Sequence, residues 1–84
     1  WQAYLAWIAT LEEGSVARRK MEGVPKYGEI VIDSNHVAML ANAFDKAQAR
    51  QTPEQQAWSK TLLSMLHDIH QESAIYLMVR RLRD

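Results

Sequence analysis

The apolar positions in the last third of the chain form two helical stripes. The first stripe has the spacing of one α-helical face and consists of Trp58, Leu62, Met65, Leu66 and Ile69. The second stripe follows an i, i+3, i+4, i+7 pattern and consists of Ile75, Met78, Val79 and Leu82. On one straight helix, at about 100° per residue, the two stripes would lie roughly 100–120° apart.

The polar stretch between the stripes decides how this region folds. A break near His70–Ser73 would make Ser73 the N-cap of a separate helix over residues 74–83. No Gly or Pro forces a turn there. We therefore expect one long C-terminal helix that continues or only kinks, with neighbours on two sides.

Two further helices are predicted upstream. The second of them follows two competing N-caps, Asp33 and Ser34, and should end near residues 50–51. A capping box then opens the C-terminal helix, with Thr52 as N-cap, Pro53 as the first helical residue and Gln55 at N3. The upstream stripes consist of Trp1, Tyr4, Leu5, Ile8 and Leu11 within residues 1–13, and of Val37, Leu40, Ala41, Phe44 and Ala47.

Short elements are predicted between these two upstream helices. Gly14-Ser15 combines a helix stop with a good N-cap, so we expect a short basic helix over residues 16–22 that Gly23 ends. Residues 24–28 contain Pro and Gly and predict a loop. Residues 29–32 have strong β-propensity but no second strand to pair with. We interpret them as an extended linker whose isoleucines plug the core, the alternative being pairing between two copies in a homodimer.

These elements predict an all-α fold, a small bundle of three to four helices in a single domain over residues 1–84. The sequence opens on Trp1 rather than Met and ends at Asp84 inside a helical pattern. We therefore expect it to be a fragment of a longer protein.

Composition narrows the function classes. Ten basic residues balance ten acidic ones, so no global field holds the chain on nucleic acid or on a membrane. There is no cysteine, which excludes a disulfide framework and a thiolate metal site and fits a cytoplasmic protein. No apolar run approaches the ~18 residues of a transmembrane helix, and no signal peptide is visible. We expect no membrane association.

No catalytic motif stands out. The sequence lacks a Gly-rich phosphate loop, a G-x-S-x-G elbow and an H-E-x-x-H motif. His67 and His70 share a helix face at i, i+3, but a metal site would need His36 or Glu72 to converge on them. We expect ordinary histidines, no metal, no cofactor and no enzymatic activity.

The apolar surplus favours a protein partner. A helical domain of this size does not easily bury both C-terminal stripes together with Trp7 and the Ile30–Ile32 segment in one monomer. Trp7 lies off the apolar stripe of residues 1–13, so it either caps the edge of the core or anchors a partner. The prediction is a regulatory protein–protein interaction module that forms homo-oligomers, with Trp7, Ile75, Met78, Val79 and Leu82 as partner-binding residues.

The alternative is a transcription regulator of the helix-turn-helix type. A break at residues 70–73 would give two helices in the right order, the second with three arginines. The zero net charge, the absence of a turn glycine and the apolar last helix count against it. The candidate phosphate contacts are Arg80, Arg81, Arg83, Arg18, Arg19 and Lys20. A charge run such as the last three is usually a solvated face, and a contact with phosphate or with an acidic partner is the alternative.

The order of features adds a family resemblance. Trp1 and Trp7 precede an Ile32-Asp33 pair that opens a helix with Val37 and Leu40, and residues 62–67 lead into residues 73–82. This order resembles the phage late-gene Q-type antiterminators and their ArpU-like relatives. The resemblance implies a helix-turn-helix that binds DNA or RNA polymerase during transcription.

Overall fold

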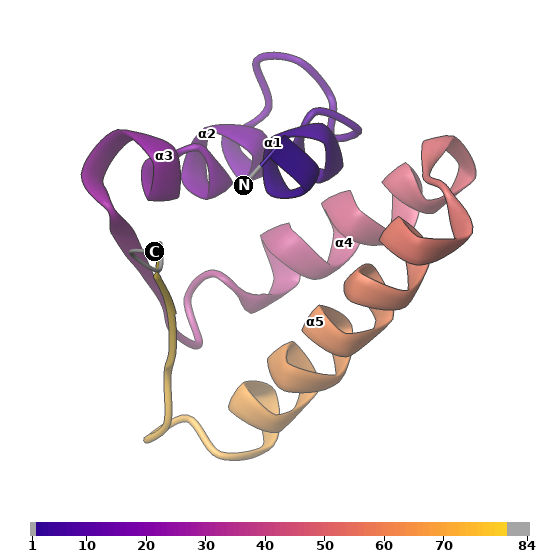
Figure 1. Ribbon diagram of the computed structural model, residues 1–84. Coiled ribbons are helices and arrows are strands. Elements are labelled where there is room, and N and C mark those ends of the chain that lie inside the picture. Colours follow the sequence, from indigo (N-terminus) through magenta and orange to yellow (C-terminus); the bar gives the residue numbers. More distant parts are fainter. Residues whose placement is uncertain (1, 81–84) are drawn as a thin grey trace.

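The computed structural model describes residues 2–80 and shows three groups of elements (Figure 1). The short helices α1, α2 and α3 lie across one side of a pair of longer helices, α4 and α5, and a two-stranded sheet stands beside them. The bounds are Gln2–Ile8 for α1, Val16–Met21 for α2, Gly23–Tyr27 for α3, Glu29–Ile32 for β1, Val37–Ala47 for α4, Pro53–Gln71 for α5 and Leu77–Arg80 for β2.

The α4–α5 pair follows the local sequence signals closely. A single 3-10 turn, Gln48–Arg50, continues α4 to the corner. Thr52 then caps α5, because its hydroxyl accepts from the Gln55 backbone N–H at 3.2 Å while the Gln55 side chain accepts from the Thr52 N–H at 3.0 Å. The predicted capping box is confirmed, and the short corner places α4 against α5.

The N-terminal helices are shorter than expected. The first ends at Ile8 rather than near Glu13. Ser15 caps α2 as predicted, with its hydroxyl accepting from the Arg18 N–H at 3.1 Å. Gly23 does not end the helical region, because it is the first residue of α3, where a loop was predicted. A Cβ at Gly23 would lie 2.5 Å from Ile30 Cγ2, so this glycine lets α3 pack closely on β1.

The sheet overturns the prediction of an all-α bundle. β1 and β2 pair antiparallel, with Ile30 opposite Val79 and Ile32 opposite Leu77. The fold is therefore a mixed one, largely helical with an antiparallel two-stranded sheet. The segment read as an unpaired linker has a partner within the same chain, although its two isoleucines do plug the core as expected, being 8% and 0% exposed.

The prediction of one long C-terminal helix is also wrong. Helix α5 ends at Gln71, and Glu72 is extended with φ −133° and ψ 90°. A turn follows, in which the Ile75 N–H donates to the Glu72 carbonyl at 3.1 Å. The chain then runs back as β2. Tertiary pairing prevails over helical periodicity here, because strand formation satisfies the backbone groups of β1 and β2 together.

The next difference concerns the start of α4. Neither Asp33 nor Ser34 is the N-cap, because α4 begins at Val37 behind His36. Asp33 instead forms a local turn, with its Oδ1 accepting from the Asn35 N–H at 2.9 Å and its own N–H donating to His36 Nδ1 at 3.1 Å. These competing bonds delay the helix by one turn.

The core draws on helices and sheet together. Trp7 packs into this core, with its ring centroid 5.1 Å from that of Phe44 and 6.0 Å from that of Trp58. Met21, Val24, Leu40, Leu66 and Ile69 complete the interior with exposures of at most 2%. Among residues 2–80, no helix is both long and apolar enough to cross a membrane.

Candidate docking groove beside the basic helix

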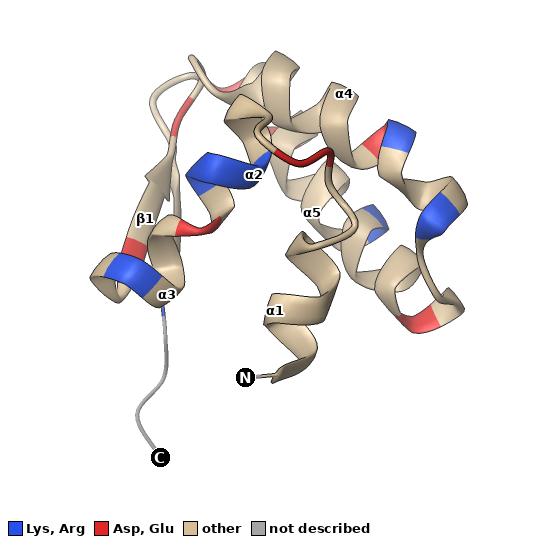
Figure 2. Ribbon diagram, turned by 90° about the horizontal axis from the view of Figure 1, so that it is seen from above, with Lys and Arg blue, Asp and Glu red and all other residues tan. Residues whose placement is uncertain are grey.

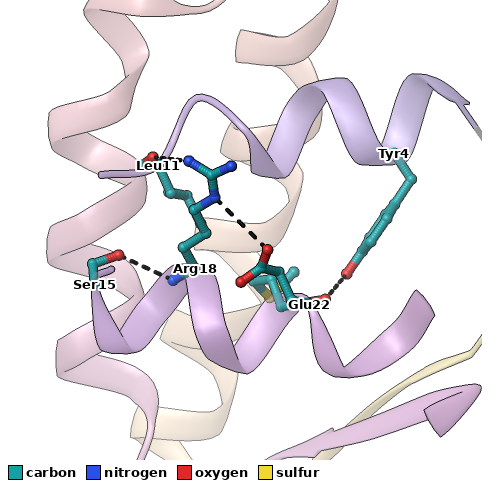
Figure 3. A network of polar contacts seen from close by, with 6 residues as sticks. Tyr4, Leu11, Ser15, Arg18 and Glu22 are labelled. Atoms are coloured by element: carbon teal, nitrogen blue, oxygen red, sulfur yellow. Dashed lines mark hydrogen bonds and ion pairs between the residues drawn. The ribbon is translucent and has the colours of Figure 1, made fainter. Parts of the chain in front are cut away.

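The position of α1 against α2 is fixed by one tyrosine. Tyr4 extends from α1, and its hydroxyl donates to the backbone carbonyl of Met21, the last residue of α2, at 2.7 Å (Figure 3). Burial raises the pKa of the Tyr4 hydroxyl well above its ordinary value. The neutral hydroxyl therefore acts as a fixed donor that holds the two helices side by side.

A second link comes from the basic helix itself. Arg18 reaches back toward the loop after α1, where its Nη1 donates to the Leu11 carbonyl at 3.4 Å (Figure 3). Its Nε lies 3.9 Å from Oε2 of Glu22, the residue that follows α2. Arg18 thus has a structural role, and its charge is partly balanced by Glu22.

Between these links lies a groove of about 540 Å³ that separates α1 from α2 and α3. Its apolar part comes from Leu5, Ile8 and Pro25, of which Ile8 is buried and the other two are half-buried. Its charged part comes from Arg18, Arg19, Glu22 and Lys26. The volume falls within the range of roughly 300–1,000 Å³ that is usual for binding sites.

The charges on the groove are unequal. Three cations face one carboxylate, and that carboxylate is paired with Arg18. Arg19 and Lys26 are exposed, and neither forms an ion pair with another residue of 2–80, although Lys26 Nζ lies 5.7 Å from the centroid of the Tyr27 ring. Helix α1, which forms the opposite wall, carries no charged residue within Gln2–Ile8 (Figure 2). The groove therefore presents an apolar wall beside a basic one.

A second hollow of about 550 Å³ lies where the start of α2 faces α4. It combines Glu12 with Lys46 and Arg50, and Arg50 already donates from Nε to the Thr10 carbonyl at 3.0 Å. Val16, which is 65% exposed, borders this hollow. Its mixed charge makes it a weaker candidate than the groove beside α1.

The predicted partner-binding residues do not form one surface. Trp7 is buried, and its Nε1 donates to Ser59 Oγ at 3.0 Å, so it is part of the core and not an exposed anchor. Ile75 and Met78 are exposed, whereas Val79 is half-buried on the inner side of β2. Leu82 lies outside the described residues. The expected shared helical face does not exist, because residues 77–80 are a strand.

The predicted cations separate in the same way. Arg18 and Arg19 line the groove, and Lys20 lies beside them on α2, half-buried. Arg80 is exposed on β2, with its Nε 3.0 Å from Met78 Sδ. Arg81 and Arg83 lie outside the described residues. The recognition helix of the alternative prediction does not form, since residues 72–76 are irregular and 77–80 extended.

Sequence reasoning missed the groove as a site. Leu5 and Ile8 were assigned to the core stripe, and Pro25 and Lys26 were assigned to a loop. The basic run on α2 was the one visible signal, and only the unforeseen helix α3 brings Lys26 to the same groove. His67 and His70 are both exposed on α5. Within residues 2–80, no three His, Cys, Asp or Glu side chains gather as metal ligands.

Comparison with known proteins identifies the family. The family model described as formate hydrogenlyase maturation protein HycH matches residues 1–81. The protein of that name in Escherichia coli K12 is 83% identical over all 84 residues, as is the one in Escherichia coli O157:H7. Hydrogenase-4 component J of Escherichia coli K12 is 47% identical over 79 residues, which cover 94% of this chain and 57% of that protein. No solved structure matches the chain significantly.

These matches replace the phage assignment. The chain spans 62% of the length of the two HycH proteins. The resemblance to Q-type antiterminators was wrong, because it depended on the order of common residue types and on a C-terminal helix that does not form. With a family match from residue 1 to residue 81, the chain belongs to the HycH family of formate hydrogenlyase maturation proteins.

Proposed function

We propose that the protein containing this chain acts in the maturation of a formate hydrogenlyase, and that this chain contributes by binding a protein component of the hydrogenase without catalysing a reaction. The observation that carries the proposal is the 83% identity to the Escherichia coli maturation protein over the whole chain. A relative named as a component of hydrogenase-4 supports the same class of target. This function replaces the self-associating module and the transcription regulator.

The geometry supports binding rather than chemistry. The groove beside α1 combines apolar side chains with exposed cations, so it offers a partner both apolar contact and positive charge to complement. The buried polar side chains described between residues 2 and 80 all have hydrogen-bond partners. Their pairing is what a structural interior requires.

A chimera tests the proposal. The 84 residues replace their counterparts in Escherichia coli HycH, and the chimera is expressed in a strain from which HycH has been deleted. We expect hydrogen release from formate to match that of the strain carrying its own HycH, since the replaced segment is 83% identical. Gas chromatography of the headspace gives the readout.

Two controls make the result decisive. The deletion strain with an empty vector sets the baseline, and immunoblotting shows that the chimera accumulates like native HycH. A chimera that accumulates normally but releases no hydrogen above the baseline contradicts the proposed function.

A further inference from the structure

We infer that the groove between α1 and α2–α3 docks an acidic amphipathic helix from a hydrogenase component, an inference that rests on the proposed function and specifies the partner's chemistry. The groove has the two walls that such a segment needs. Leu5 and Pro25, both half-buried, supply apolar surface above the buried Ile8, and Arg19 and Lys26 supply exposed positive charge.

The side-chain pattern of an amphipathic helix matches a groove with an apolar and a basic part. An amphipathic helix binds by placing apolar anchors, spaced i, i+3, i+4 and i+7, against an apolar channel. On α1 the groove is lined by Leu5 and Ile8, which lie one turn apart on the same face. Helix α1 carries no charged residue within Gln2–Ile8, so it gives no charge for a partner to neutralise.

The charge pattern selects an acidic partner. Glu22 is engaged by Arg18 at 3.9 Å, so it does not offset the other cations of the groove. Carboxylates on the polar face of a docked helix would lie against Arg19 and Lys26. Complementary charge of this kind steers encounter and suppresses wrong partners. A basic or neutral helix would leave both cations without compensation.

A protein segment suits this groove better than a nucleic acid. The chain has no net charge, whereas duplex-binding domains carry a basic excess. Half the groove is apolar wall, which phosphates do not use. Arg80, the cation of β2, also stands on a different element from those of the groove.

Binding is measured on the purified chimera with a defined probe. The probe is a fluorescein-labelled synthetic helix with leucines on one face and glutamates on the other, followed by fluorescence anisotropy at low and high salt. Two matched peptides carry lysine for each glutamate, or serine for each leucine. We expect the acidic leucine peptide to bind, both matched peptides to bind at least roughly tenfold more weakly, and salt to weaken the binding.

Protein variants locate the site. R19E/K26E should lower the affinity roughly tenfold or more, because two exposed attractions become repulsions. R19K/K26R should retain binding. K46E/K60E changes the net charge equally at exposed positions of α4 and α5 outside the groove and should bind within about twofold of the parent. The inference is overturned if the acidic leucine peptide does not bind, if the serine peptide binds as tightly, or if a short DNA duplex binds more tightly. It is also overturned if R19E/K26E binds the acidic peptide as tightly as the parent, or if K46E/K60E loses as much affinity as R19E/K26E.

Hydrogen release separates this inference from the proposed function. R19E/K26E in the chimera should lower formate-dependent hydrogen release at unchanged protein level, while R19K/K26R and K46E/K60E should not. If the parent chimera restores hydrogen and R19E/K26E does so fully, the groove is not the docking site and the proposed function stands. If the parent chimera restores nothing, the proposed function fails, and the peptide measurements alone decide whether the groove binds an acidic helix.

Discussion

At the scale of single residues, the interior is specified by a closed ring of polar side chains. Trp7 Nε1 donates to Ser59 Oγ at 3.0 Å, and Ser59 donates to Gln51 Oε1 at 2.7 Å. Gln51 Nε2 donates to Thr10 Oγ1 at 3.0 Å, and Thr10 donates back to the Trp7 carbonyl at 2.6 Å. The ring ties the end of α1 to the α4–α5 corner. A single off-stripe tryptophan gave no hint of this role, because its partners come from distant segments.

Removing one member of the ring should destabilise the fold. In Ser59→Ala, Trp7 Nε1 and Gln51 Oε1 lose their partner in the buried interior, where Ser59 is 0% exposed. We expect the free energy of unfolding to fall by about 1–3 kcal/mol, as is usual when buried polar groups are left unpaired. Urea denaturation measures it. Ser64→Ala is the matched control on the exposed side of α5, and an equal effect of both substitutions would contradict the role of the ring.

A tyrosine gives the fold a pH dependence. Burial raises the pKa of Tyr4 in the folded protein above its unfolded value of about 10. Its contribution to stability is therefore fully present below pH ~10 and is lost as the pH rises from there toward the folded pKa. Tyr4→Phe should lower stability at neutral pH, because the hydrogen bond to the Met21 carbonyl is lost. When the pH is raised, the variant should lose less stability than the parent protein.

Urea titrations at neutral and alkaline pH measure this difference. Tyr27→Phe is the matched control, since the Tyr27 side chain is 74% exposed. The comparison is between each variant and the parent at the same pH. Identical alkaline losses in Tyr4→Phe and the parent would show that Tyr4 is not the titrating group.

At the scale of elements, the sequence predicted the helices whose ends and faces are determined by nearby residues. The Thr52 capping box, the Ser15 cap and the stripe through Leu40 and Phe44 all placed helices correctly, since their partners lie a few residues away. The sheet depends instead on Ile32 meeting Leu77. Because the sequence does not show that pairing, residues 29–32 were interpreted as a linker and residues 77–80 as part of a helix. One unpredicted long-range contact therefore explains both errors.

Substitutions along β2 distinguish the strand from the expected helix. Leu77 and Val79 are half-buried on the inner face, and Met78 between them is 36% exposed on the outer face. Leu77→Ser and Val79→Ser should each lower the free energy of unfolding by about 1–2 kcal/mol, while Met78→Ser should change it by less than about 0.5 kcal/mol. On a helix, Met78 and Val79 would share a face. Urea midpoints showing equal costs at those two positions would therefore contradict the strand.

At the scale of the molecule, two long-range closures join the elements. The polar ring links α1 to α5, and the sheet links the segment after α3 to the chain after α5 (Figure 1). The candidate groove depends on two shorter links, from Tyr4 to the Met21 carbonyl and from Arg18 to the Leu11 carbonyl, because they hold α1 against α2. The basic run alone could be read from the sequence, but not the apolar wall opposite it.

These closures predict that the sheet and the α4–α5 corner unfold together. The core is continuous from Trp7 through Phe44 and Met21 to Ile30 and Ile32, and small domains with one core usually unfold in a single transition. Ser59→Ala, at the corner, should therefore reduce amide-exchange protection in β1 by the same free energy by which it lowers global stability. Hydrogen exchange of residues 30–32, followed by NMR, makes the comparison.

The alternative is a sheet that opens by itself, as locally stable units can. Exchange in β1 would then be limited by local opening and would not respond to Ser59→Ala, although amides in the middle of α5 would. Leu77→Ser, a substitution in the sheet, also distinguishes the two cases. If the sheet opens alone, this substitution would reduce amide-exchange protection within the sheet only. We expect it to reach α5 as well, since Ile30 and Ile32 pack into the same core as Leu66 and Ile69. Such coupling would make the α1–α2 groove sensitive to the strand pairing, because a domain that unfolds in one transition cannot lose its sheet and keep its docking surface.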